Sequence, residues 1–351
     1  MNSKLISIIV PMYFEEKVVE ECYKRLTEVA NTNKLNYELI FVNDGSTDRT
    51  LELLEEIAEK DPRTKVISFS RNFGHQIAVT AGIDNANGDA VVIIDADLQD
   101  PPELIPEMIK LWEEGYEVVY GKRKKRDGES WFKLTTAKAF YRVLNKLSSV
   151  KIPMDTGDFR LVDRKAIEAL KRMPEQNRFL RGMSSWVGFK QIPLEYERKE
   201  RFAGETKYPL KKMLKFAMDG IFSFSSKPLK LIEYLGLGSI LLSLIIIIYS
   251  LTSLILSLGN ITLGWSLTII SITLIGGIQL LSIGIIGEYI SRIYDETRQR
   301  PLYIVDKEIN LERPTRKHTY MINRKLLDEN LRKPLYLISK EIGDNKQYNV
   351  K

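Results

Sequence analysis

The sequence predicts an α/β protein in which a doubly wound, mainly parallel sheet is followed by amphipathic juxtamembrane helices and a two-helix transmembrane hairpin. Three observations lead to this fold class. Runs of Val and Ile without polar alternation take turns with helically spaced segments, which is typical of strands covered on both faces. Clusters of polar residues follow several of these runs. No Asp, Glu, Lys or Arg occurs from Tyr234 to Gly287, in a chain otherwise rich in charge.

The elements of the α/β part follow one another in a regular order. The expected strands are Ile6–Val10, Glu38–Val42, Lys65–Phe69, Ala90–Ile94, Glu117–Tyr120 and Gln191–Tyr196. The expected helices are Glu16–Ala30, Asp48–Glu59, Gln76–Asn85, Pro102–Glu114, Trp131–Leu147 and Arg164–Lys171. Because open parallel sheets bind ligands at the carboxyl ends of their strands, the polar residues at those ends are the candidate site.

The domain boundaries follow from where charge and apolar runs change. We expect a cytosolic catalytic domain over 1–208, amphipathic interfacial helices over 209–231, transmembrane helices within 232–289, at about 235–258 and 263–287, and a cytosolic C-terminal tail with short strands over 290–351. Basic residues on both sides of the hairpin direct both of its ends to the cytoplasm: Lys227, Lys230, Arg292, Arg298 and Arg300. These features predict a multi-pass inner-membrane protein with a cytoplasmic catalytic domain. A surface helix for 209–231 and a buried soluble hairpin are the alternatives.

The composition limits which kinds of partner are expected. The net charge is +6, and the basic residues cluster near the apolar spans and near residues that we consider below as candidates for phosphate binding. No nucleic-acid motif accompanies them, so no nucleic-acid partner is expected. The single cysteine, Cys22, excludes an internal disulfide and is expected to be a buried, inert thiol in a reducing compartment. His75 and His318 lack metal-ligand spacing and are expected to be structural.

Asp95-Ala96-Asp97 is the strongest candidate for metal binding. In a strand the two carboxylates share a face, where they can hold a hard divalent cation together with phosphate oxygens. Gln99 can add an oxygen ligand. The alternative for a bare Asp-x-Asp is a solvated pair that caps the next helix. Here the pair follows the buried-type run Val91–Ile94 and precedes Asp100-Pro101-Pro102-Glu103, which favours the metal site.

Other strand ends supply candidates for substrate binding. Asp44 can accept hydrogen bonds from a base or ribose, although Asn-Asp-Gly-Ser is also a common turn sequence. Pro11, Tyr13 and Glu15 would line the same base pocket. Asp158 is a candidate catalytic carboxylate, which could orient the acceptor because an ionised phosphate acceptor needs no base. The candidates for holding anionic substrates are Lys122, Arg123, Arg201 and Lys207.

Together these motifs resemble those of the inverting family-two glycosyltransferases with the GT-A fold, in the branch of dolichyl-phosphate mannose synthase and the bacterial GtrB-type polyprenyl-phosphate glycosyltransferases. The resemblance extends from about Ser7 to Ile309 and rests on Ile9–Glu16, Val42–Ser46, Asp95–Glu103, Thr156–Arg160 and Arg201–Tyr208. Phe14 departs from the family pattern, which often has Asn there, and Thr206 stands where Ser is common.

The resemblance implies a glycosyltransferase that moves a sugar, with glucose from UDP as first choice, onto polyisoprenyl (undecaprenyl) phosphate. It implies Mg²⁺ or Mn²⁺ held by Asp95, Asp97 and Gln99. It implies catalytic roles for Asp158, Asp97, Arg201 and Lys207. It also implies nucleotide-sugar contacts at Pro11, Tyr13, Glu15, Val42, Asp44, Asp95, Ala96, Asp97, Arg123, Arg201 and Lys207.

Two other functions stay open at this point. A processive polysaccharide synthase shares the fold and metal motif, but Arg181–Trp186 does not match its Gln-x-x-Arg-Trp motif and two spans cannot easily enclose a pore. A catalytically silent, nucleotide-binding membrane scaffold is the other. In the tail, Arg300–Ile309 resembles Lys333–Ile342, and we expect these segments to pair as strands or to dock on a neighbouring subunit. A homo-oligomer is therefore a hypothesis.

Overall fold

The computed structural model describes residues 4–124, 153, 156–197, 222, 225–255 and 261–311. The chain up to Leu311 forms one compact unit. The helix expected at 131–147, most of the amphipathic segment 209–231 and the second tail segment lie outside the described residues.

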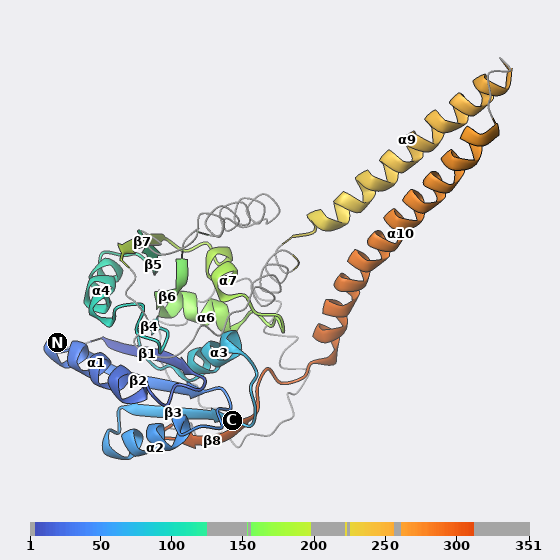
Figure 1. The fold of residues 1–351 in the computed structure, drawn as a ribbon. Coiled ribbons are helices and arrows are strands. Elements are labelled where there is room, and N and C mark those ends of the chain that lie inside the picture. The colour runs from blue at the N-terminus through green and yellow to red at the C-terminus, as the bar shows by residue number, and fades with distance from the viewer. Residues whose placement is uncertain are drawn as a thin grey trace, which may run out of the picture. The chain divides into compact units, whose positions relative to one another are not determined.

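A mixed eight-stranded sheet in the order β7-β5-β6-β4-β1-β2-β3-β8 forms the centre of the described fold (Figure 1). Its strands are β1 Leu5–Met12, β2 Asn36–Asn43, β3 Thr64–Phe69, β4 Ala90–Ile93, β5 Val118–Arg123, β6 Thr156–Asp163, β7 Gln191–Tyr196 and β8 Val305–Ile309. The block β4-β1-β2-β3 is parallel throughout, and β5 pairs in parallel with β7. The strands predicted from Val and Ile runs are confirmed.

Helices cover both faces of the sheet, as the predicted doubly wound fold requires. The helices are α1 Val19–Thr32, α2 Thr50–Lys60, α3 His75–Asn85, the 3₁₀ turn η1 Pro102–Leu104, α4 Ile105–Glu113, α6 Arg164–Lys171 and α7 Leu180–Trp186. One core joins a sheet face to α1, α2 and α4, and the other core joins the opposite face to α3, α6 and α7. Adjacent residues of β1 divide between the two cores, Ile8 and Val10 into the first and Ile9 into the second, because successive strand side chains point to opposite faces.

The segment around Asp158 is a strand, which the sequence analysis did not predict. β6 lies in the middle of the sheet and pairs antiparallel with both β4 and β5. Charged residues on this strand, Asp158 and Arg160, are buried. Gly157 leaves room for the side chain of Arg123, because a Cβ at this position would lie 2.9 Å from Arg123 Nη2 and that guanidinium would have to shift. Because β6 lies between β5 and β4, it places Asp158 inside the sheet and not at one of its outer strands.

The C-terminal elements differ from the expected boundaries. Two long helices, α9 Lys227–Ile255 and α10 Ile261–Arg298, start before the spans predicted at 235–258 and 263–287. α10 also ends after its predicted span, whereas the described part of α9 ends at Ile255. The tail then returns to the catalytic sheet, where β8 pairs antiparallel with β3. Pairing of Arg300–Ile309 with its second copy, which lies outside the described residues, and docking on another subunit stay predictions. In the described part of the chain, β8 has one strand partner. Its partner is β3 of the same chain, because that edge offers unpaired backbone groups.

Candidate active site

Two of the predicted acidic residues meet at the carboxyl edge of the sheet through a histidine. Asp95 follows β4, Asp158 lies on β6, and His75 is the first residue of α3. His75 Nε2 lies 3.1 Å from Asp158 Oδ2 and 3.6 Å from Asp95 Oδ1. The structure therefore brings Asp95 and Asp158 to one place, as the sequence analysis expected. His75, expected to be structural, lies between them.

Asp158 is held by three side chains. Arg181 of α7 donates from Nε to Asp158 Oδ1 at 2.7 Å and from Nη2 to Oδ2 at 3.2 Å. Gln76 Nε2 donates to Oδ2 at 3.3 Å. Burial raises the pKa of Asp158, but the charge of Arg181 and the hydrogen bond from His75 outweigh burial and hold the pKa well below its usual value. Asp158 is thus an ionised, oriented carboxylate.

His75 responds to the same charges. Burial alone lowers the pKa of His75, but the hydrogen bond to Asp158 and the charges of Asp95 and Asp158 outweigh it and raise the pKa from 6.5 to about 9. The imidazole is therefore a cation at neutral pH, and it partly neutralises two neighbouring carboxylates.

The Asp95–Gln99 segment fits a divalent cation in part. Asp95 Oδ1 is buried and accepts no hydrogen bond, and burial raises the pKa of this carboxyl to about 6. Asp97 Oδ1 accepts from the backbone N–H of Gln99 at 3.2 Å, which folds the segment into a turn. Within the described ranges, no three acidic, histidine or cysteine side chains form a metal cluster by themselves. Two carboxylates are nevertheless enough where substrate phosphates complete the shell of Mg²⁺.

Asp44 has local partners. Its carboxylate accepts hydrogen bonds from the backbone N–H of Phe73 at 2.7 Å and of Gly74 at 3.0 Å, and from Asn72 Nδ2 at 2.9 Å. Asp44 thus positions the loop that leads to His75. Burial raises the pKa of Asp44, while the two backbone hydrogen bonds oppose this rise. Gly45 has a φ of +67°, and a Cβ there would lie 2.3 Å from the carbonyl carbon of Arg71.

The expected base pocket presents few exposed side chains. Val42 and Asp44 are buried, at 0% and 2% exposure, and so is Pro11. Tyr13 and Glu15 are half-buried and are therefore the predicted pocket residues that a ligand can reach most easily. The predicted nucleotide contacts of these residues, and of the buried Ala96, stay predictions.

The predicted phosphate-binding residues divide into two groups. Arg123 Nη2 lies 3.8 Å from Asp100 Oδ1, and its Nε donates to the Tyr196 hydroxyl at 3.4 Å. Lys122 forms an ion pair with Glu195 at 2.7 Å. Arg201 and Lys207 lie outside the described residues, so their roles stay predictions.

The sequence analysis missed His75, Gln76 and Arg181. His75 and Gln76 are more than 80 positions away from Asp158 in sequence, and Arg181 is 23 positions away. None of them belongs to a motif with recognisable spacing. A weak signal was available, because His75 directly follows a glycine at the start of an expected helix.

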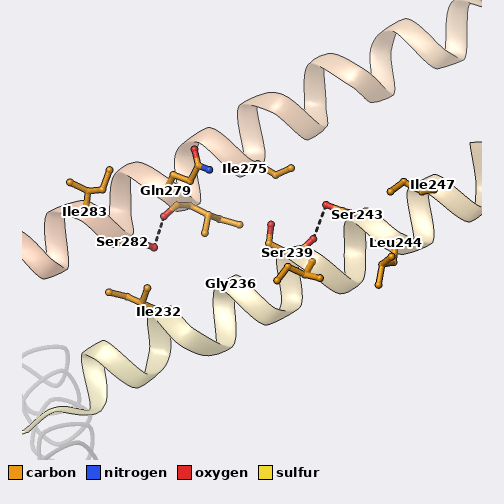
Figure 2. Close-up of a pocket in the computed structure, with 12 residues that line it drawn as sticks. Ile232, Gly236, Ser239, Ser243, Leu244, Ile247, Ile275, Gln279, Ser282 and Ile283 are labelled. Carbon is orange, nitrogen blue, oxygen red and sulfur yellow. Dashed lines mark hydrogen bonds between the residues drawn. The ribbon is translucent and has the colours of Figure 1, made fainter.

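A groove of about 850 Å³ between α9 and α10 can be excluded as a phosphate or metal site (Figure 2). Its lining is apolar except for Ser239, Ser243, Gln279 and Ser282, with no ionisable side chain. The hydroxyls of Ser243 and Ser282 donate to carbonyl groups one turn earlier in their own helices. The groove is a feature of the helical hairpin, and the acidic site lies at the sheet.

The hairpin itself has the character of membrane-spanning helices. Lys227–Ile248 and Ser271–Arg298 are long and apolar enough to cross a membrane, and neither is buried within the protein. Large apolar side chains are more than half exposed along both helices: Leu237, Ile240, Leu241, Ile245, Leu280, Leu281 and Ile283. A soluble core helix would bury such side chains, so a lipid environment accounts for them better.

The chain thus combines an α/β sheet that carries acidic residues at its carboxyl edge with an apolar helical hairpin. A family model described as Glycosyl transferase family 2 matches residues 7–171. The chain belongs to glycosyl transferase family 2, within its GtrB-like members.

Relatives match most of the chain. It is 58% identical over 309 residues to the "Uncharacterized glycosyltransferase YkcC" of Bacillus subtilis, covering 87% of this chain and 94% of that protein. It is 42% identical over 302 residues to the "Prophage bactoprenol glucosyl transferase homolog" of Escherichia coli, covering 86% and 98%. A solved structure of glucosyl-3-phosphoglycerate synthase from Mycobacterium tuberculosis with Mn²⁺, UDP-glucose and glycerol 3-phosphate is 19% identical, with a TM-score of 0.42, covering 62% and 78%.

Proposed function

We propose that this protein is a membrane enzyme that transfers glucose from a nucleotide-activated donor, with UDP-glucose as the preferred donor, to a polyprenyl phosphate. The observation that carries the proposal is the meeting of Asp95 and Asp158 at the carboxyl edge of the sheet, in a chain that also has two apolar helices. Relatives named bactoprenol glucosyl transferase match 86% of the chain at 42% identity, which supports glucose as the sugar and a polyprenyl carrier as the acceptor.

The reaction is a displacement at the anomeric carbon of the donor sugar. A phosphate oxygen of the acceptor forms the new bond to this carbon while the bond to the nucleoside diphosphate breaks, and the diphosphate leaves with the electron pair. The acceptor is already ionised and needs no base. Asp158, fixed by Arg181 and His75, therefore acts by orienting the substrates and balancing their charges.

A divalent cation, Mg²⁺ or Mn²⁺, is part of this proposal. Asp95 and Asp97 would hold it, with Gln99 as a further oxygen ligand. The buried, unbonded Oδ1 of Asp95 is the structural observation that fits an ion. When bound, such a cation neutralises the charge that develops on the departing diphosphate. Arg123, Arg201 and Lys207 are proposed to hold phosphate groups by their positive charge.

The acceptor is a lipid, so the enzyme must work at a membrane surface. We propose that α9 and α10 span the inner membrane and that the catalytic domain is cytoplasmic. Basic residues near the start of α9 and near the end of α10 support this orientation, because positive charge favours the cytoplasmic side: Lys227, Lys230, Arg292, Arg298 and Arg300.

The test is direct transfer by the purified full-length protein in detergent. A panel of radiolabelled nucleotide sugars is supplied with undecaprenyl phosphate and Mg²⁺ or Mn²⁺, and label in the organic phase is counted. We expect labelled lipid with UDP-glucose, abolished by EDTA. Labelling with another donor would correct the sugar or the nucleotide. The proposal fails if no nucleotide sugar labels the lipid while the same preparation is folded and monodisperse.

A further inference from the structure

Phe14 combines an unusual backbone conformation with an exposed aromatic ring. It follows β1 with a φ of +53°, and its side chain is 40% exposed. The left-handed region is uncommon for residues other than Gly and Asn, and for a bulky residue it is an outlier that costs stability. Residues held in such a conformation by their surroundings often have a role in function.

Neighbouring loops hold Phe14 in this conformation. The backbone N–H of Phe14 donates to Ser46 Oγ at 3.0 Å, and the backbone N–H of Glu15 donates to Thr50 Oγ1 at 2.9 Å. Both acceptors belong to the segment that follows β2. The loop after β1 is therefore fixed to the loop after β2, and these two loops frame the predicted base pocket.

A second aromatic ring lies beside that of Phe14. The Phe14 ring meets the ring of Tyr13 edge to face, with centroids 4.5 Å apart and an interplanar angle of 65°. Such a pair leaves flat aromatic surface available for stacking. Val42 and Asp44, by contrast, are buried. A planar heteroaromatic base that enters between the two loops would find aromatic surface on the β1 side.

We propose that Phe14 stacks on the nucleobase of the donor and strengthens its binding. The ring raises the affinity for the donor, while the left-handed backbone conformation of Phe14 lowers the stability of the fold. This inference rests on the proposed function, because it requires a nucleotide donor. It assigns a binding role to a position where the sequence departs from the Asn that is frequent in similar enzymes.

The experiment compares Phe14→Asn and Phe14→Trp with the parent, as full-length proteins in detergent. Asn tolerates a positive φ, so Phe14→Asn removes the ring and the backbone strain together. Titration calorimetry with Mg²⁺ measures the binding of UDP and, separately, of pyrophosphate, which has no base. We expect Phe14→Asn to bind UDP about tenfold more weakly, to bind pyrophosphate unchanged, and to melt about 2 °C higher. Phe14→Trp should keep UDP affinity within about threefold.

Lys34→Asn is the matched control. Lys34 is exposed and has a φ of +52°, so this substitution relieves the same backbone conformation away from the strand ends of the site. It should raise the melting temperature similarly and leave UDP binding unchanged.

The outcomes separate this inference from the proposed function. Unchanged UDP affinity in Phe14→Asn, or an equal loss of UDP and pyrophosphate affinity, would overturn the stacking proposal and leave the proposed function standing. A lower melting temperature for Phe14→Asn would also overturn it, since the ring would then be part of the packing. A parent protein that binds no nucleoside diphosphate from a panel of UDP, GDP, CDP, ADP and dTDP would overturn the proposed function as well.

Discussion

Arg181 and Asp158 form a two-pronged ion pair, with Nε donating to Oδ1 at 2.7 Å and Nη2 donating to Oδ2 at 3.2 Å. The pair joins α7, which carries Arg181, to β6, which carries Asp158. A planar guanidinium that makes two parallel hydrogen bonds fixes both the position and the rotation of a carboxylate. Asp158 is therefore oriented before any substrate binds.

The first prediction concerns the removal of this pair. Arg181→Ala leaves Asp158 buried without its strongest partner, so we expect a loss of about 2 kcal/mol in stability and a fall in transfer rate of at least about tenfold. Arg181→Lys keeps the charge but loses the paired geometry, and it should recover more stability than activity. Thermal unfolding and the lipid-labelling assay measure the two effects.

Arg49→Ala is the control for this prediction. Arg49 pairs with Glu52 on the surface, with 64% and 57% of the two side chains exposed, and such pairs contribute little. Its stability and activity should equal those of the parent. Equal behaviour of Arg181→Ala and Arg49→Ala would show that the Asp158 pair has no special role.

The second prediction concerns His75. Its imidazole lies 3.1 Å from Asp158 Oδ2, and Gln76 contributes a weaker contact to the same oxygen. His75→Ala should lower kcat about tenfold with a smaller change in the KM for the donor, because the lost contact orients Asp158 and not the nucleotide. His75→Gln offers an amide donor and should restore part of kcat. A change in KM alone, with the same kcat in both variants, would contradict a positioning role.

Much of the fold could be predicted because the physical signal is local. β1, β2, β3 and β4 each contain adjacent Val, Ile, Leu or Phe residues, and burial on both sheet faces favours such runs. β6 could not be recognised in the same way, because Asp158 and Arg160 look like loop residues until their partners are known. Arg160 is satisfied by Ser184 of α7 and by the carbonyl group of Gly157, so its burial depends on an element from another part of the chain.

The site was predictable to a similar extent. Asp95 and Asp158 were identified from their motifs, and their proximity follows from the sheet order, in which β4 neighbours β6. The partners that control these carboxylates come from α3 and α7, and no local pattern marks them. Asp44 was found for its strand-end position, but its observed hydrogen bonds go to the loop at Phe73 and Gly74.

The third prediction concerns the metal. Asp97→Asn keeps the size of the side chain and removes one charge, so the Mg²⁺ concentration for half-maximal transfer should rise at least about tenfold, as the loss of a carboxylate ligand requires. Asp89→Asn is a control, because Asp89 accepts a hydrogen bond from the Leu5 N–H near the start of β1. An unchanged metal requirement in Asp97→Asn would remove this residue from the proposed ligand set.

The fourth prediction concerns the thiol of Cys22, which is 1% exposed on α1. Burial raises the pKa of Cys22 to about 12. Since only the thiolate reacts, alkylation by iodoacetamide should stay slow in the native protein as pH rises from 7 to 10, whereas an exposed thiol would react faster across its usual pKa of about 8.5. Mass spectrometry after timed alkylation measures this, and denatured protein is the positive control. Fast native labelling at pH 8 would contradict the buried position.

The last prediction concerns the return of the chain to the sheet after α10. Tyr303 stacks on Phe69 of β3, with ring centroids 5.0 Å apart, and its hydroxyl donates to Asp84 Oδ2 at 3.1 Å. Tyr303→Phe keeps the stack and should cost about 1 kcal/mol. Tyr303→Ala loses both contacts and should cost about 2 kcal/mol or more.

The two variants together test whether this contact holds β8 against β3. If it does, Tyr303→Ala should also speed proteolysis after residue 299, because release of β8 uncovers the unpaired edge of β3. Ile304→Ala, at a neighbouring side chain that is 54% exposed, is the control and should change neither stability nor cleavage. A Tyr303→Ala protein that melts and is cleaved like Ile304→Ala would mean that the backbone pairing of β8 is sufficient without the aromatic stack. A Tyr303→Ala protein that begins to self-associate as β3 is uncovered would show that this edge can pair between copies of the chain.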